Sequence, residues 1–170
     1  SDDLFLPLNS EFEARSDYPV GEVLSGHRIY VPEYDVAHML HEGVNSIAYN
    51  AFYNCSNMVN IVLPNSISGI GRYAFLSCSS LLNIDLPDSI KNLGDEAFRY
   101  CNSLESITIP EGVTTIGKWM FLHCNAMTSV ELPDSLTAIG QEAFSYCTNL
   151  KEVNIPAGVT VEIANSVIFE

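Results

Sequence analysis

The residues with the greatest capacity for chemistry are five cysteines at a fixed spacing. They are Cys55, Cys78, Cys101, Cys124 and Cys147, each 23 residues after the one before. Thiols can form disulfides, bind metals or act as nucleophiles. Zinc ligands usually stand only a few residues apart, and no histidine accompanies this row. The regular step instead predicts a row of small buried thiols, although close stacking could bring neighbours within disulfide distance, about 4.4–6.8 Å between Cα atoms.

Three other patterns could suggest a metal or cofactor site. His38 and His41, followed by Glu42, stand three residues apart on an expected short helix, but this is not the HExxH arrangement of zinc enzymes. The GxGxxA sequence of residues 69–74 lacks the βαβ unit of about 30 residues that a dinucleotide site needs. Asp85 and Glu131 fall two repeats apart, about 10 Å, which is too far to share a calcium ion. We therefore predict no metal and no cofactor.

Catalysis has no support in the pattern either. No serine, cysteine or threonine stands on a strand–turn–helix elbow, and the four histidines show no paired acid–base setting. We expect a protein that is not an enzyme.

The same 23-residue step governs the elements that must position these side chains. It also separates Pro64, Pro87, Pro110, Pro133 and Pro156, and likewise Phe52, Phe75, Phe98, Phe121 and Phe144. Three residue types holding one period are the signature of a solenoid, in which each unit buries its apolar face against its neighbours.

Each unit contains two local periodicities. Ile107 and Ile109 alternate with polar residues, which predicts a short half-buried strand that the following proline ends. Ala97, Phe98 and Cys101 are spaced i, i+1, i+4, which predicts about one turn of helix with its apolar edge inward. A glycine stands before each such turn, at positions 71, 94, 117 and 140, where we expect positive φ.

The repeated pattern, written LPDSLTAIGQEAFSYCTNLKEVNIP at Leu132–Pro156, closely resembles the BspA-type leucine-rich repeats. The resemblance covers about residues 41–160. It implies an α/β fold: a right-handed β/α solenoid with one parallel strand and one short helical turn per coil. We expect an N-terminal cap over residues 1–40 with a degenerate first strand, Ile29–Val31. Five full units and a partial sixth follow over residues 41–160, and residues 161–170 form a C-terminal cap or a truncated repeat.

Charge and hydropathy exclude two classes of partner. Seven Lys and Arg against 21 Asp and Glu give a net charge of −14, which repels phosphate backbones. No apolar run approaches the ~20 residues of a membrane span. We therefore expect neither nucleic-acid binding nor membrane insertion in this segment.

Repeat phase predicts two exposed surfaces. The outward strand positions are polar and mildly acidic, and they include the candidate contacts Asn83, Asp85, Thr108 and Glu131. The positions that flank the Ala-Phe-x-x-Cys core carry larger side chains, Leu76 and Leu122 with the candidate contacts Tyr53, Tyr73, Tyr100, Trp119, His123 and Tyr146. The alternative for the strand positions is a solvated surface that binds no partner. The alternative for the aromatic rings is that they pack between coils.

The family resemblance implies a secreted or surface-attached protein of a bacterium or protozoan, with adhesion as its role. We predict a non-catalytic extracellular or cell-surface module that recognises a protein or glycan of a host or neighbouring cell. The alternative is a structural spacer or self-assembly segment of a larger surface protein. The sequence leaves the oligomeric state open.

Overall fold

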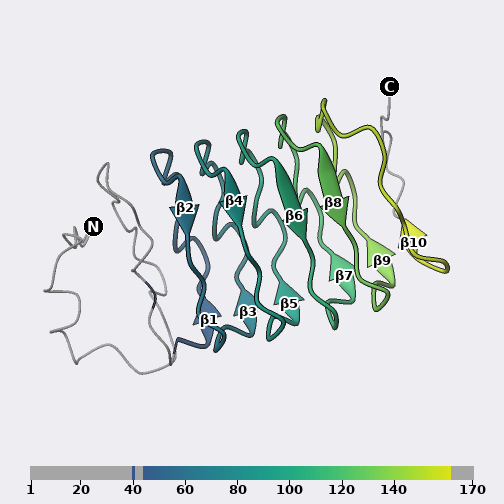
Figure 1. Cartoon of the computed structure of the whole chain (residues 1–170), viewed down its shortest axis with the longest axis horizontal. Coiled ribbons are helices and arrows are strands. Elements are labelled where there is room, and N and C mark those ends of the chain that lie inside the picture. The colour runs from purple at the N-terminus through teal and green to yellow at the C-terminus, as the bar shows by residue number, and fades with distance from the viewer. Residues whose placement is uncertain (1–39, 41–43, 162–170) are drawn as a thin grey trace, which may run out of the picture.

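A computed structural model describes residues 40 and 44–161 and shows a parallel β-solenoid. Its coils stand side by side along the long axis of the molecule (Figure 1). The predicted N-terminal strand, the short helix with His38 and His41, and the C-terminal cap lie outside the described residues. The right-handed sense of winding stays a prediction.

Each coil contributes short strands to two parallel rows (Figure 1). One row is the strand predicted before each proline: β2 (Asn60–Ile61), β4 (Asn83–Ile84), β6 (Ser106–Thr108) and β8 (Ser129–Glu131). The other row was not predicted: β1 (Ser46–Ile47), β3 (Gly69–Ile70), β5 (Asn92–Leu93), β7 (Thr115–Ile116), β9 (Ala138–Ile139) and β10 (Thr160–Val161). The prediction of one strand per coil is therefore wrong.

Every described strand pair except β9–β10 joins residues 23 positions apart in the sequence, and β9–β10 joins residues 22 positions apart. Ser106 pairs with Ser129, and Asn60 pairs with Asn83. The rows form the paired sets β1-β3-β5, β7-β9-β10, β2-β4 and β6-β8. β5 and β7 follow each other in one row but belong to different paired sets. Next to these two strands, the Asp95 carboxylate accepts a hydrogen bond from the Lys118 backbone N–H at 3.0 Å.

The predicted helical turn is not confirmed, because the described residues contain no helix. The segment of each coil that follows the second strand row, residues 48–55, 71–78, 94–101, 117–124 and 140–147, forms a chain of tight turns. In one such turn segment, Phe98 donates its backbone N–H to Met120 of the next coil at 3.1 Å. Cys101 donates instead to Phe98 within its own segment, also at 3.1 Å. Alternate N–H groups are thus used between coils, and no helical ladder can form.

Positive φ occurs at two places in every turn segment, four residues apart. The residues are Asn50, Asn54, Tyr73, Ser77, Glu96, Tyr100, Trp119, His123, Glu142 and Tyr146. This conformation costs an L-residue about 1–2 kcal/mol. Hydrogen bonds between coils offset it: for example, Tyr100 donates its N–H to Leu122 at 2.9 Å, and His123 donates to Ser145 at 2.9 Å.

The repeat glycines do not have positive φ, so that expectation is wrong. Among the described glycines, only Gly112 and Gly158 do. A Cβ atom built on Gly71 would lie 2.7 Å from the backbone carbon of Ala48, because the neighbouring coil passes that close. The position requires a small residue for space rather than for backbone freedom.

The core is a column of phenylalanines with cysteines beside it. Phe98 stacks between Phe75 and Phe121, with ring centroids 5.4 and 5.7 Å apart and interplanar angles of 2° and 6°. All five cysteines are free and buried, which confirms the predicted thiol row. Four of them donate their S–H to the phenylalanine carbonyl of the preceding coil, as Cys101 does to Phe75 at 3.2 Å.

Candidate functional site

The outward surface of β2, β4, β6 and β8 is the strand face. All its predicted positions are exposed, including Asn83, Asp85, Thr108 and Glu131. Thr108 donates its hydroxyl to the Glu131 carboxylate of the next coil at 3.1 Å. Both side chains are exposed, so this hydrogen bond adds little stability. The face offers hydrogen-bonding groups but, at its described positions, no aromatic anchor.

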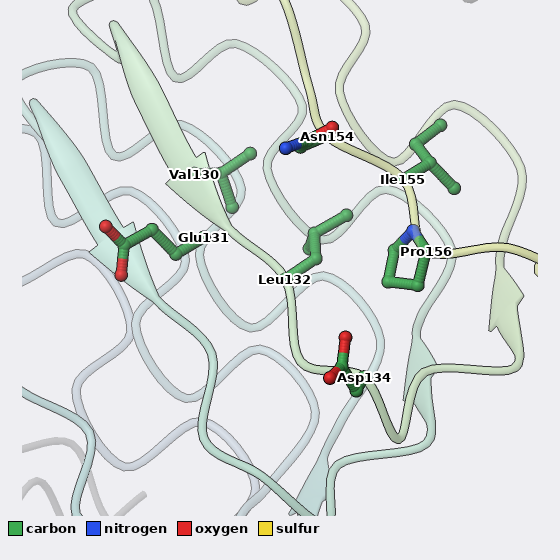
Figure 2. Close-up of a pocket in the computed structure, with 7 residues that line it drawn as sticks. All are labelled: Val130, Glu131, Leu132, Asp134, Asn154, Ile155 and Pro156. Carbon is green, nitrogen blue, oxygen red and sulfur yellow. The ribbon is translucent and has the colours of Figure 1, made fainter.

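Two hollows interrupt the strand face where neighbouring strands do not pair. One, of about 150 Å³, lies between β4 and β6 beside Asp85 and Thr108. The other, of about 370 Å³, lies between β8 and residues 154–156 (Figure 2). Figure 2 shows Val130 and Leu132 near Asn154 and Ile155, whereas the Glu131 carboxylate points away toward the neighbouring strand. The hollow therefore gathers no convergent set of charged groups.

The turn segments form the second surface, the turn face, whose side chains stand in two columns set by the positive-φ positions. Tyr146 is exposed, whereas the other predicted contacts are half-buried: Tyr53, Tyr73, Tyr100, Trp119 and His123. The first column is Asn50, Tyr73, Glu96, Trp119 and Glu142, and the second is Asn54, Ser77, Tyr100, His123 and Tyr146. Five of the six predicted turn-side contacts thus occupy a column, while Tyr53 lies one residue before the second. Leu122 was expected at the surface, but it is buried, with 6% of it exposed, although it lies outside the core cluster that contains Phe121.

The second column contains a stack of three rings. Tyr100 stacks on His123 with centroids 4.9 Å apart, and His123 stacks on Tyr146 at 4.3 Å with an interplanar angle of 6°. The Asn102 amide nitrogen donates to the carbonyls of Tyr100 and His123 at 3.2 and 2.8 Å. Asn125 bridges the carbonyls of His123 and Tyr146 in the same way. The asparagine amides therefore hold the backbone of the three residues whose rings stack.

A buried carboxylate organises the first column. Glu96 is only 2% exposed, and it accepts hydrogen bonds from Arg72 at 2.9 Å and from Arg99 at 2.8 Å. Burial alone would raise the pKa of Glu96, but the hydrogen bonds from Arg72, Arg99 and Tyr73 and the charge of Arg99 together outweigh burial and hold the pKa below its ordinary value. Glu96 therefore stays ionised and fixes both guanidinium groups.

The cations in turn lie over aromatic rings. Arg72 lies 4.4 Å from the ring centroid of Tyr73, and Lys118 lies 3.8 Å from that of Trp119. Arg99 is 4.8 Å from the Tyr100 centroid and 5.3 Å from that of Trp119. Such contacts contribute about 0.5–1 kcal/mol each at exposed sites. We call this group around Glu96 the cation–aromatic patch: Arg72, Tyr73, Arg99, Tyr100, Lys118 and Trp119.

Sequence reasoning placed the three rings of the patch on the turn side but missed its charged members. Glu96 and Arg99 stand three residues apart, and Arg72 precedes Glu96 by 24 residues, one more than a repeat, so the charges were visible in the repeat phase. The burial of Glu96 was not visible, because an expected helical turn gave no reason to turn a glutamate inward.

The described residues contain no group of three or more His, Cys, Asp or Glu that could hold a metal. Burial raises the pKa of the Cys78, Cys101 and Cys124 thiols well above the ordinary value and that of Cys147 to about 12. These four thiols are therefore protonated at neutral pH and poor nucleophiles. Within the same part of the chain, no helix has the length and apolarity to cross a membrane.

Known sequences and structures resemble this chain closely. Residues 42–170 match the BspA type leucine rich repeat region in six copies. A leucine-rich repeat protein from T. pallidum is 34% identical with a TM-score of 0.67, over 78% of this chain and 60% of that one. A leucine rich cell surface protein from Faecalibacterium prausnitzii A2-165 is 39% identical with a TM-score of 0.64, over 79% of this chain and 34% of that one.

A third solved structure, a leucine-rich repeat protein from Bacteroides ovatus, is 32% identical with a TM-score of 0.53, over 81% of this chain and 42% of that one. The chain thus spans less than two thirds of the length of each of these structures. Among curated proteins, none matches it.

Proposed function

Because the chain belongs to the family of BspA-type leucine-rich repeat proteins, we propose that it is a non-catalytic binding module that acts outside the cell or at its surface. It recognises a protein or glycan of a host or neighbouring cell by non-covalent contact. The description of the F. prausnitzii relative as a cell surface protein supports the location.

The observation that carries this proposal is the composition and order of the turn face. Interface residues with large contributions to affinity are enriched in Trp, Tyr and Arg. On the turn face, Arg99 lies 4.8 Å from the Tyr100 ring centroid and 5.3 Å from that of Trp119, and Glu96 holds Arg99 through an ion pair. A surface fixed before binding loses less side-chain entropy when a partner docks. The strand face, by contrast, offers small polar groups and exposed carboxylates.

The test is direct binding of the immobilised chain to a panel of matrix proteins, mucins and glycans at low and high salt. The variant Tyr100→Ala/Trp119→Ala removes two rings of the turn face, and Asn83→Ala/Thr108→Ala is a matched double change on the strand face. Saturable binding that only the first variant loses supports the turn face as the binding surface. Loss in the strand-face variant alone would move the site to the other side of the solenoid.

A structural spacer or self-assembly segment is the second candidate, and the unbroken core favours it. The phenylalanine stack runs from Phe52 to Phe144 with centroid distances between 5.1 and 5.7 Å. Each coil of such a core packs only on its neighbours, so the array extends in one direction, as a spacer must. A folded chain that binds nothing on the panel would favour this role, and sedimentation across a concentration series would separate a spacer from an assembling segment.

A further inference from the structure

The rings of the turn face present few open faces to a partner. His123 has a tyrosine stacked on each side, and Tyr73, Tyr100 and Trp119 each have a cation over the ring. Among the described rings of the two columns, only Tyr146 combines a single stacked neighbour with high exposure, 61%. A sugar stacks on an aromatic side chain through an open ring face. Closed faces therefore leave ring edges and cations as the main contact groups of this surface, since the Tyr100 hydroxyl accepts a hydrogen bond from Arg99 at 3.3 Å and Tyr73 hydrogen-bonds Glu96.

The charge of the patch differs from that of the rest of the chain. Of the five Lys and Arg residues in the described part, Arg72, Arg99 and Lys118 belong to the patch. Glu96, the adjacent Asp95 and Glu142, which follows Trp119 in the first column, offset these three charges, so the patch is close to neutral in a chain of net charge −14. A partner that carries negative charge is accommodated here and repelled by the carboxylates of the strand face.

The cations are also held in place. Glu96 fixes both arginines, and Arg72 still exposes half of its side chain, 50%. Lys118 is fixed over Trp119. Guanidinium and ammonium groups that are already ordered bind carboxylates with less loss of side-chain freedom.

We propose that the cation–aromatic patch docks a protein segment that carries carboxylates. Arg72 and Lys118 bind the carboxylates, and the edges of the aromatic rings supply the surrounding contact area. This inference rests on the proposed function, because it assumes that the turn face binds a partner, and it assigns that partner to acidic protein rather than to glycan.

The test uses the full chain and a glutamate–tyrosine copolymer as an acidic protein probe, with heparin as a sulfated glycan for comparison. Lys118→Glu reverses one charge in the patch, and Lys151→Glu makes the same change in net charge at an exposed position outside the patch. We expect Lys118→Glu to weaken copolymer binding by about tenfold or more and Lys151→Glu to change it by less than about twofold. Arg72→Gln, which removes a second patch cation, serves as an independent variant with the same expected direction.

Three outcomes would overturn the assignment. Equal losses in Lys118→Glu and Lys151→Glu would show that net charge and not the patch controls binding. Heparin that binds more tightly than the copolymer and depends on Lys118 would assign the patch to sulfated glycans. No copolymer binding by the folded wild-type chain would remove the acidic-protein assignment, while binding to the panel of matrix proteins and glycans would still decide the proposed function.

Discussion

Truncation of the phenylalanine column should destabilise the chain most at its centre. Phe98 is fully buried with a ring stacked on each side, whereas Phe144 is only partly buried and, among the described rings, stacks on Phe121 alone. Phe→Ala changes in cores cost about 3–5 kcal/mol, and each aromatic pair contributes about 0.5–1.5 kcal/mol beyond its buried area. We therefore expect Phe98→Ala to lower the free energy of unfolding by about 4–5 kcal/mol and Phe144→Ala by about 2–3 kcal/mol.

Urea unfolding measures this difference. Trp119, the single tryptophan, reports on the coil next to Phe98 by fluorescence, and far-ultraviolet circular dichroism reports on the whole array. With an m-value of about 2 kcal/mol per molar urea, Phe98→Ala should move the unfolding midpoint down by about 2 M. Ser106→Ala, on the exposed strand face, is the control and should change stability by less than about 0.5 kcal/mol.

Equal losses in Phe98→Ala and Phe144→Ala would refute the column as the source of stability, since the two residues differ in the number of stacked neighbours. A loss in Ser106→Ala as large as that in Phe98→Ala would refute the division into inward and outward positions. Separate unfolding transitions by fluorescence and circular dichroism would show that the coils do not unfold as one unit, and each midpoint would then be compared by itself.

Three further predictions follow from the turn segments and the thiol row. Glu96→Gln should lower the free energy of unfolding by about 1–3 kcal/mol at neutral pH. Because the folded pKa of Glu96 is depressed, this difference should shrink as the pH falls below about 4.3, the pKa of an unfolded glutamate. Urea titrations at several pH values would measure the change. A thiol reagent should label the five cysteines readily in denatured protein and almost none in native protein, and fast native labelling would contradict a buried row. Ser77→Gly should leave the unfolding free energy unchanged or raise it by up to about 1 kcal/mol, because Ser77 has positive φ, whereas Ser80→Gly should lower it by about 0.5–1 kcal/mol.

The array was predictable because its period is carried by residues whose environment repeats. Phe98 and Cys101 sit in the same surroundings as their counterparts in the neighbouring coils, so spacing alone places them in the core, where both are buried. Ile107 was placed inward by alternation, and the structure confirms it. The exposed positions of the strand face were predicted from the same 23-residue register.

The turn segment was not predictable from local pattern. The i, i+1, i+4 spacing of Ala97, Phe98 and Cys101 is compatible with a helix, but it is equally satisfied by turns whose N–H groups bond to the next coil. Positive φ at Tyr100 and Trp119 has no signal in residue type, since aromatic residues rarely adopt it. The second strand row was not predicted, because its strands are two residues long and too short to show an alternating pattern.

The contrast between core and surface positions within this one chain indicates where partner specificity resides. The phenylalanine and the cysteine are identical in all five full repeats, because each must fill the same space between the same neighbours. The two positive-φ columns are filled instead by Asn, Tyr, Glu, Trp, Ser and His. Their backbone conformation is held by hydrogen bonds between backbone groups of neighbouring coils, so several residue types fit these positions without disturbing the solenoid. Substitutions within the columns should therefore alter binding with little loss of stability. Glu96 is the exception: it carries the ion pairs that order the patch, so its replacement should affect both.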